Sequence, residues 1–455
     1  MHHPSWPAPL LAAGAALLLA GCAGTDPHLA AQSIARQVEA RTGVTPRLQR
    51  AGDPAVAQET KELLAAPLTA SAALQVALLN NPGLQATFWE AGVAQADLAQ
   101  ATRLRNPSFG FARLSGGGER ELERAVGFDL AGLLTMPLRS RMETRRVEQT
   151  RLTVAAAIEA QLLATRKAWV EAVAAQQSLA YARQVSASTE AAAELMERMV
   201  KAGNASRLDL AREAAQHAEA SATVLRATRD AARLREALTR QLGLSGEQAG
   251  YTLPERLPEL PTAPRELARI EQIALARRLD VQAARLQSEH LAADLGLTRA
   301  TRLVNVLEVG WQDKRESHAA RATGYEVSLE LPLFDWGGAR VARAESVYMQ
   351  SLHRVADIAS TARSEAREAY LGYRTNYELA RHYRDEVIPL RKKIADETLL
   401  RYNGMLASPF ELLLDAREQA QAVSSYIDAL KDFWLADAAL DGALGGKPND
   451  KEHQQ

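Results

Sequence analysis

Apolar side chains recur at spacings of three, four or seven residues over long parts of the chain. Three runs show this pattern most clearly: Ile158, Leu162, Trp169 and Val173; Ala366, Tyr370, Tyr373 and Tyr377; and Val423, Ile427, Leu430 and Trp434. Such spacing places the apolar positions on one face of an α-helix. No proline occurs between Leu138 and Val200, and a helix of that extent would be roughly 90 Å long. We therefore expect long helices that pack in a coiled-coil or tubular assembly.

Two short segments show a different pattern, in which apolar and polar residues alternate with a period of two, as in β-strands. In the second half of the chain, Tyr325, Val327, Leu329, Leu331 and Leu333 alternate with Glu326, Ser328 and Glu330. In the first half, Val126, Phe128 and Leu130 alternate with Gly127 and Asp129. We expect residues 107–114 and 304–311 to form the partner strands, with glycine-containing loops at 116–118 and 324 inside each pair.

The chain contains a tandem duplication that is visible in three pairs of matching segments. Gln75–Leu78 matches Gln272–Leu275, Ala101–Asn106 matches Ala300–Asn305, and Gly203 with Ser206–Leu210 matches Gly404 with Ser408–Leu412. Because these matches keep nearly the same offset, we expect the two halves to share one internal order. That order is two shorter helices, two strands and two long helices.

Four prolines lie close together between the halves, at Pro254, Pro258, Pro261 and Pro264. Prolines at this density cannot lie inside a helix, so the segment is expected to be an extended connector. The predicted divisions are therefore a first repeat at 68–250, a connector at 251–266, a second repeat at 267–445 and a polar tail at 446–455.

The N-terminus has the pattern of a bacterial signal peptide at residues 1–21. The apolar stretch Leu10–Ala20 is too short to span a bilayer and leads into Gly21-Cys22, so that Leu19–Cys22 resembles the lipobox of bacterial lipoproteins. This resemblance makes Cys22 the expected lipidation site and 22–67 a lipidated linker. Ala23 after the cysteine resembles lipoproteins sorted to the outer membrane. Because no Lys or Arg precedes the apolar run, an ordinary signal peptide with a chance cysteine is the alternative.

Composition narrows the class of protein further. Hydrophobic residues make up 47% of the chain but aromatic residues only 5%, which is typical of long helices and coiled coils. A formal net charge of −1 gives no electrostatic basis for a nucleic-acid partner. No apolar run after Cys22 is long enough for a transmembrane helix, so any membrane-spanning part is expected to consist of β-strands.

Four amphipathic strands cannot close a barrel alone, because their outer edges would be unpaired in lipid. Three copies of the chain would supply twelve strands, an even number within the range of known barrels. The polar face with Asp129, Glu326, Ser328 and Glu330 would then line a watery lumen. We therefore expect a mainly α fold with membrane β-structure, in which helical hairpins form a trimeric periplasmic tunnel and each protomer adds four strands to one barrel.

The segment Leu331-Pro332-Leu333-Phe334-Asp335-Trp336-Gly337-Gly338, the pair Asn81-Pro82 and the duplicated plan resemble the TolC-like outer-membrane efflux family. The resemblance covers roughly Leu68–Leu444. It implies a homotrimer with a twelve-stranded barrel and a helical tunnel, without a cofactor. It also implies docking to a periplasmic adaptor (membrane fusion) protein and an inner-membrane pump, with the barrel in outer-membrane lipid.

Several site residues follow from this resemblance. Leu413–Arg417 is similar to the family segment at the periplasmic end of the tunnel, which makes Asp415 the candidate for an acidic ring at the gate. Three such carboxylates would repel one another and bind cations; the alternative is an exposed Asp paired with Arg417 or a neighbour. The family places adaptor contact at the helix turns, which assigns that role to five residues: Gly203, Asp209, Arg212, Gly404 and Glu411. Asp209 and Arg212 could also hold the tip shut, although such pairs are usually solvated.

Other functions fit the sequence less well. The nine histidines never form a helical i, i+4 pair, and no Walker loop, G-x-S-x-G or dinucleotide fingerprint occurs in a fitting context, so we expect no enzyme and no metal site. A coiled-coil scaffold lipoprotein without a pore explains the helices but not the strands. A conduit for type I protein secretion is a further alternative. For an efflux channel, the exported solute stays open between drugs and metal ions.

Overall fold

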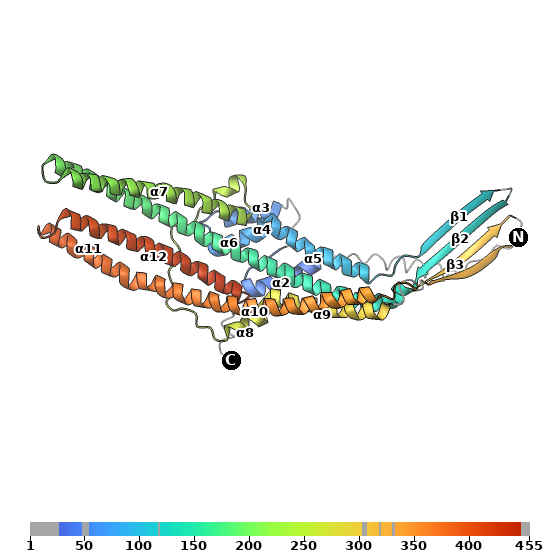
Figure 1. Ribbon diagram of the computed structural model, residues 1–455. Coiled ribbons are helices and arrows are strands. Elements are labelled where there is room, and N and C mark those ends of the chain that lie inside the picture. The colour runs from blue at the N-terminus through green and yellow to red at the C-terminus, as the bar shows by residue number, and fades with distance from the viewer. Residues whose placement is uncertain are drawn as a thin grey trace. The chain divides into compact units, whose positions relative to one another are not determined.

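The structure is a computed structural model that describes residues 27–47, 54–116, 119–302, 307–317, 320–329 and 333–446. Most of these residues are helical, and four strands form a single sheet (Figure 1). The N-terminal elements are α2 (Pro27–Thr42), α3 (Pro54–Leu63), α4 (Ala70–Asn80) and α5 (Pro82–Ala101). The strands are β1 (Ser108–Gly116), β2 (Glu119–Asp129), β3 (Leu307–Glu316) and β4 (Ala322–Leu329). The remaining helices are α6 (Leu130–Lys201), α7 (Arg207–Leu242), η1 (Gly246–Gly250), α8 (Ile270–Arg277), α9 (Leu279–Thr301), α10 (Gly338–His382), η2 (Tyr383–Val387), α11 (Ile388–Asn403) and α12 (Pro409–Ala443).

The chain forms two compact units. The first consists of the described residues of Met1–Ser33, Trp89–Arg151 and Leu286–Ser351, and it contains the sheet. The second consists of the described residues of Ile34–Phe88, Leu152–Arg285 and Leu352–Gln455, and it contains the helical hairpins. No helix among the described residues is both long and apolar enough to cross a membrane.

In the first unit, the four strands are antiparallel and follow the order β1-β2-β3-β4. Each repeat supplies one hairpin, and the two hairpins join through β2 and β3, where Val126 lies opposite Trp311. The four predicted strands are thus confirmed, but Gly324 lies inside β4, opposite Gln312, and not in the loop before it, and Leu333 lies outside the strand. β2 ends at Asp129 instead of continuing to Leu130, because the Asp129 carboxylate accepts a hydrogen bond from the Gly132 backbone N–H at 2.6 Å and caps α6.

The predicted long helices are confirmed as well. α6 contains 72 residues and begins at Leu130, before Pro137, so it is longer than the proline-free stretch indicated. α10 is followed by a π-helical turn, in which the Ile388 N–H donates to the Tyr383 carbonyl five residues earlier. Pro389 explains this widening, because proline has no N–H and its ring clashes with the carbonyl four residues before it.

The core of the second unit is built around aromatic side chains. The rings of Tyr373 and Tyr377 pack against Phe433 with centroids 5.5 and 5.8 Å apart. The Trp169 indole N–H donates to the Leu68 carbonyl at 2.7 Å, and the Tyr377 hydroxyl donates to the Thr262 carbonyl at 3.0 Å. Residues 251–266 contain no helix or strand, and the hydrogen bond from Tyr377 to Thr262 attaches part of this segment to the core.

The segment expected to be a linker contains two helices, α2 and α3, which the sequence analysis did not anticipate. Ile34 and Val38 of α2 are fully buried in the second unit. The Arg41 guanidinium forms an ion pair with Glu159 and donates to the carbonyls of Arg277 at 2.7 Å and Gly445 at 2.6 Å. α2 is short and is followed by Pro46 and Pro54. The sequence of this region therefore shows little helical periodicity.

Candidate functional site

The sheet has one apolar face, because the register of the strands aligns their apolar residues. Phe109, Val126, Trp311 and Tyr325 form one row across all four strands. The face consists of Phe109, Phe111, Val126, Phe128, Val309, Trp311, Tyr325, Val327 and Leu329. Most of these side chains are exposed within the protomer; Tyr325 is 84% and Phe109 69% exposed. Large apolar side chains in a continuous exposed face indicate a surface that lipid or another protein covers.

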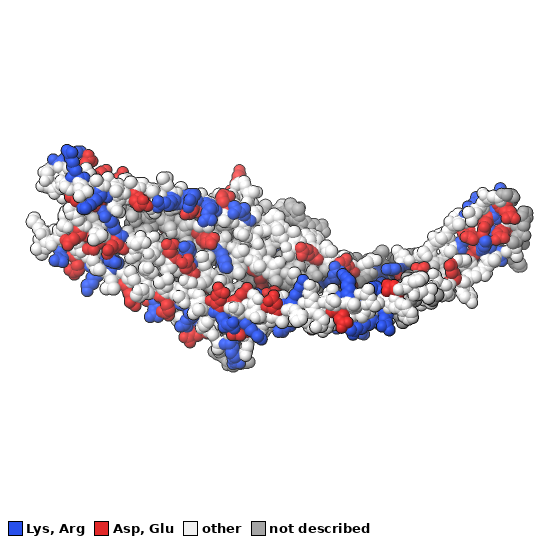
Figure 2. Space-filling model, in the orientation of Figure 1, with Lys and Arg blue, Asp and Glu red and all other residues white. Residues whose placement is uncertain are grey.

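The opposite face is small and polar. Its rows contain Ser108, Gly110, Ala125, Gly127, Glu308, Gly310, Gln312, Glu326 and Ser328. Toward the ends of the strands, Lys314 forms ion pairs with Glu316 at 3.1 Å and with Glu121. Charged side chains gather over this end of the sheet in Figure 2, and the strand surface beside them is mostly uncharged. The predicted polar residues Asp129, Glu326 and Ser328 lie on this face, whereas Glu330 is outside the described residues.

The first tip is the turn between α6 and α7, where two of the predicted residues shape the chain. Gly203 has φ +79°, which a residue with a Cβ adopts only at a cost. Ser206 and Asp209 form a capping box, because each side chain accepts a hydrogen bond from the other's backbone N–H. The Ser206 hydroxyl also donates to the Asp209 carboxylate at 2.6 Å, which lowers the pKa of Asp209. Arg212 lies 3.5 Å from Asp209, so both contact local partners within the protomer.

The second tip, between α11 and α12, repeats the capping box with Ser408 and Glu411. Gly404 does not supply the permissive backbone that the sequence suggested, since its φ is −81°. Met405 takes the left-handed conformation instead, with φ 60° and its side chain 93% exposed. Both repeats therefore reverse direction through a left-handed residue followed by a serine-capped helix, but only the first uses glycine there.

Asp415 lies two turns into α12 and contacts the neighbouring helix of its own hairpin. The Thr398 hydroxyl of α11 donates to the Asp415 carboxylate at 2.5 Å, and the Asp415 side chain is half-buried. Arg417 does not pair with Asp415. Its guanidinium instead binds both carboxylate oxygens of Glu213 on α7 at 2.5 Å. The Glu213–Arg417 pair therefore joins the hairpin of one repeat to that of the other.

Glu213 is a site residue that the sequence analysis missed. It is only 5% exposed, and a buried carboxylate needs a partner to stay charged. The sequence does contain one indication of this role. Glu213 lies three residues after Leu210, on the inward-facing side of α7, where an unpaired charge would be costly. Its partner could not be read from spacing, since Arg417 is 204 positions away.

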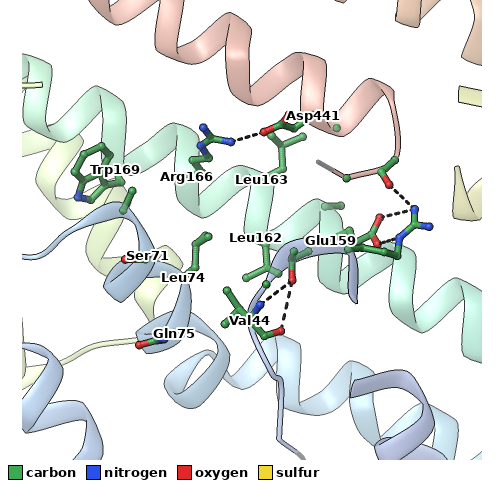
Figure 3. A pocket seen from close by; sticks show the side chains of 18 of the residues that line it. Val44, Ser71, Leu74, Gln75, Glu159, Leu162, Leu163, Arg166, Trp169 and Asp441 are labelled. Carbon is green, nitrogen blue, oxygen red and sulfur yellow. Dashed lines mark hydrogen bonds and ion pairs between the residues drawn. The ribbon is translucent and has the colours of Figure 1, made fainter. Parts of the chain in front are cut away.

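A pocket of about 930 Å³ lies within the second unit, between α4, α6 and the end of α12 (Figure 3). Leu74, Leu162 and Leu163 provide apolar walls. Its carboxylates are paired with arginines: Glu159 with Arg41, Asp280 with Arg278 and Asp441 with Arg166. Within the described part of the chain, no group of His, Cys, Asp and Glu side chains is arranged to hold a metal ion.

A closed ring of charges supports one wall of this pocket. Arg166 reaches Asp437 at 2.7 Å and Asp441 at 2.6 Å, and Arg265 from the connector reaches the same two carboxylates at 2.6 and 2.7 Å. Burial lowers the pKa of Arg265, but the two aspartates raise it by more, so its net shift is upward. Each carboxylate thus has two arginine partners, which is what a buried charge requires.

The sequence-predicted site residues are therefore brought together only in part. Asp209 and Arg212 form one cluster at the first tip, and Gly404 and Glu411 lie at the second. Asp415 and Arg417 are neighbours in sequence with different partners. Cys22 lies outside the described residues.

No protein-family model matches the chain, and no curated protein matches it. Several solved structures, however, match the chain. A membrane protein from Pseudomonas aeruginosa superimposes with a TM-score of 0.70 at 20% identity, covering 85% of this chain and 93% of that one. The outer membrane protein VceC from Vibrio cholerae gives 0.69 at 16% identity, with 83% and 96% covered. The Campylobacter jejuni outer membrane channel CmeC gives 0.71 at 14% identity, with 84% and 88% covered.

These similarities define the class of fold. The chain has the fold of the TolC-like outer-membrane channels, with long α-helical hairpins and four antiparallel strands in each protomer. The resemblance drawn from the sequence is thereby confirmed at the level of the fold.

Proposed function

We infer that this protein is the outer-membrane channel of a tripartite efflux system and exports small solutes, either drugs or metal ions. The observation that carries this proposal is the amphipathic sheet, whose apolar face is exposed while its other face is small and polar. A membrane on one side and a watery lumen on the other satisfy both faces. The TolC-like fold supports the same function.

The proposed channel is a homotrimer. Among the described strands, β1 and β4 each pair with a single neighbour, so both edges of the sheet offer unpaired N–H and C=O groups. In lipid, leaving one such group without a hydrogen bond costs roughly several kcal/mol of free energy. Three sheets joined edge to edge would form a closed barrel of twelve strands. The long hairpins would continue it as a periplasmic tunnel.

The remaining parts of the proposal concern single residues. Lipid attached to Cys22 would anchor the chain to the outer membrane, and Asp415 would form the acidic ring at the periplasmic gate. The two tips, with Gly203, Asp209 and Arg212 in one and Gly404 and Glu411 in the other, would contact the periplasmic adaptor, which connects the channel to an inner-membrane pump.

Neighbouring residues on β4 test the proposal, because they lie on opposite faces of the same strand. Val327→Lys places a charge on the apolar face, which in a membrane costs on the order of 2–4 kcal/mol near the midplane. Ser328→Lys places the same charge on the polar face, where water would solvate it. We expect Val327→Lys to reduce the yield of membrane-inserted trimer severalfold and Ser328→Lys to leave it unchanged.

The measurement is the amount of trimer extracted from outer membranes, together with ion conductance in planar bilayers. Equal yields for the two variants would mean that the apolar face does not contact lipid. A scaffold without a pore would then explain the protein better than a channel.

A further inference from the structure

We propose that four arginines on the apolar face of the sheet bind the phosphate groups of a lipid in the outer leaflet of the outer membrane. This arginine cluster surrounds Leu122 on β2 and consists of Arg113, Arg120, Arg124 and Arg315. The inference rests on the proposed function, because only a sheet inserted in the outer membrane brings this face into contact with outer-leaflet lipid.

The register of the strands places the four arginines around Leu122 on one face. Arg113 on β1 and Arg315 on β3 lie directly opposite Leu122, one on each side. Arg120 and Arg124 lie two residues before and after Leu122 on β2, and alternate residues of a strand point to the same face. Neighbouring strands are about 4.8 Å apart and alternate residues about 7 Å apart, so the four side chains can reach one headgroup.

The arginine cluster is continuous with the exposed aromatic residues that the proposed function turns to lipid. Phe111 lies two residues before Arg113 on β1 and directly opposite Arg124. The next row toward the helices is that of Phe109, Val126, Trp311 and Tyr325. Transmembrane barrels have aromatic girdles at both interfaces, and a charge on the lipid face is costly at the midplane but tolerated near the headgroups. The arginine cluster therefore fits the level of the headgroups.

The direction of the strands determines which leaflet the arginine cluster meets. β1 ends at Gly116 and β2 begins at Glu119, so Arg113 and Arg120 lie close to the turn between these strands. At its other end β2 leads into α6. In the proposed channel the long helices extend into the periplasm, which places the turns of the hairpins at the outer surface of the cell. The arginine cluster would therefore meet the outer leaflet.

The alternation of residues along β2 separates its charges by sign. In Glu119–Arg124 every second residue is a glutamate, and these glutamates lie on the polar face of the sheet. Lys314 on β3 forms ion pairs with Glu121 and, at 3.6 Å, with Glu123 on that face. The arginines between the glutamates lie on the apolar face. The glutamates of β2 therefore do not neutralise the arginine cluster.

Asp313 is the one acidic residue on the apolar face of the described strands, and several arginines share it. It lies opposite Arg124 in the register. The Nε of Arg321, directly before β4, donates to its carboxylate at 2.5 Å, and the Nε of Arg315 is 3.7 Å away. Counting Arg321 and Asp313 with the arginine cluster gives five positive charges and one negative charge. This end of the apolar face is therefore strongly basic.

Arg113 and Arg120 are the members of the arginine cluster that are most available to a ligand. Within the part of the chain that the structure describes, neither forms an ion pair with an acidic side chain. A neighbouring copy in the proposed barrel would bring its β4 beside β1. On the apolar face, the described residues of β4 are all uncharged: Thr323, Tyr325, Val327 and Leu329. Closing the barrel through these strands therefore leaves both arginines without an acidic partner.

Lipid A, the phosphorylated glycolipid of the bacterial outer leaflet, has the chemistry that this surface requires. Arginine binds phosphate through paired N–H donors, so neighbouring guanidiniums suit a phosphorylated headgroup. The phosphates would contact Arg113 and Arg120, and the acyl chains would lie along Phe111 and the aromatic row below it. A free phosphate or an acidic protein would use the arginines but not the apolar surface that continues from them.

The test is binding of lipid A to the detergent-extracted, delipidated full-length trimer, measured by native mass spectrometry. We expect one saturable site per protomer. Combining Arg113→Gln with Arg120→Gln should weaken binding roughly tenfold or more, as for the loss of charge-assisted hydrogen bonds. Lipid A from which the phosphates have been removed should bind the wild-type protein weakly by a similar factor. Inorganic phosphate at millimolar concentration should not displace the lipid.

Two matched variants separate the position of a charge from its amount. Arg113→Leu combined with Leu114→Arg moves one charge to the polar face without changing the net charge of the chain. This exchange should weaken binding as much as Arg113→Gln alone. Lys314→Gln removes a positive charge from the polar face near the same end of the sheet, and it should bind lipid A normally. Arg113→Lys with Arg120→Lys keeps both charges and should retain part of the affinity.

Several results would overturn the inference: no saturable binding by the wild type, normal binding by the glutamine or the exchange variant, equal binding of the phosphate-free lipid, or displacement by inorganic phosphate. An equal loss of binding in Lys314→Gln would also overturn it, because overall charge and not this face would then attract the lipid. The comparison of the two lipids uses wild-type protein, so it holds even where a variant does not assemble.

Ion conductance of the same samples separates this inference from the proposed function. A conducting trimer that does not bind lipid A refutes the lipid site alone. A protein that forms neither trimer nor pore refutes the channel.

Discussion

At the scale of single residues, the carboxylates near the tips have two distinct roles. Glu213 is buried and paired with Arg417 across the two repeats, which makes it a fixed structural contact. Asp415 is half-buried and accepts a hydrogen bond from the neutral Thr398 hydroxyl, and no basic side chain among the residues that the structure describes forms an ion pair with it. An acidic ring at a gate requires a carboxylate without an ion-pair partner, as Asp415 is.

Two substitutions can therefore separate the effect of the Asp415 charge from the effect of its hydrogen bond to Thr398. We expect Asp415→Asn to reduce cation selectivity and change single-channel conductance about twofold or more, because a ring of charges concentrates cations at a narrow opening. Thr398→Val removes the hydrogen bond to the carboxylate but keeps the charge, and it should preserve cation selectivity. Recordings in planar bilayers at low salt give the measurement. If Thr398→Val reproduces the effect of Asp415→Asn, the residue acts through hairpin packing and not as a charged ring.

At the scale of elements, periodicity was sufficient to predict the long helices and the four strands, but not the short helices α2 and α3. Helical spacing and strand alternation are local properties, so they can be read from residues that are close in sequence, such as the apolar Val327 and the polar Ser328. Contacts across the fold were not predictable, because local spacing does not show which distant residue a side chain will meet. Arg166 and Asp437 are 271 positions apart, and Arg265 lies in a connector that was expected only to be extended.

The turns were predicted in position but not in detail. A glycine in each repeat suggested that both turns use its freedom, yet Met405 adopts the left-handed conformation in the second. The cost of a left-handed residue with a Cβ is about 1–2 kcal/mol. The Ser408 capping box offsets part of that cost by satisfying backbone N–H groups at the start of α12.

The two capping boxes give a prediction for the helices that they begin. Ser206→Ala removes the acceptor for the Asp209 N–H, so we expect the first turn of α7 to be destabilised by about 1 kcal/mol. Amide hydrogen exchange over 207–210 should become roughly fivefold faster, while exchange in the middle of α7 stays unchanged. Ser188→Ala, which changes a serine inside α6, is the control. Equal protection in both variants would show that tertiary packing, not the cap, fixes this helix end.

The lowered pKa of Asp209 adds a dependence on pH. The carboxylate gains its stabilising contact with Ser206 only when ionised, so the contribution is present above the ordinary value of 3.8. It is lost as the pH falls through the lower pKa of the folded state. The difference in exchange between wild type and Ser206→Ala should therefore persist at neutral and mildly acidic pH.

At the scale of the whole molecule, the described strands of one protomer form an open sheet with β1 and β4 at its two edges. β1 and β4 are far apart in sequence and lie at opposite edges, so a closed barrel requires β1 of one copy to pair with β4 of the next. The strands alternate in direction across the sheet, and continuing this alternation makes that new pair antiparallel as well. Closure after three copies is what distinguishes a channel from an open assembly.

Cysteine crosslinking tests this closure, because the natural chain has one cysteine, Cys22, far from the strands in sequence. Ser108→Cys and Ser328→Cys place thiols on the two edge strands, on the polar face and near the helical ends. Within one protomer three strand spacings of about 4.8 Å separate the edges, so a crosslinker of roughly 8 Å should join only neighbouring copies. We expect denaturing gels to show dimer and trimer bands and no larger species, with none in Ser108→Cys alone. A ladder beyond three copies would indicate an open assembly, and crosslinking absent from membrane-inserted protein would mean that the edges do not meet. Either result would exclude the shared barrel, since pairing of both edges is the condition under which four strands per chain can exist in lipid.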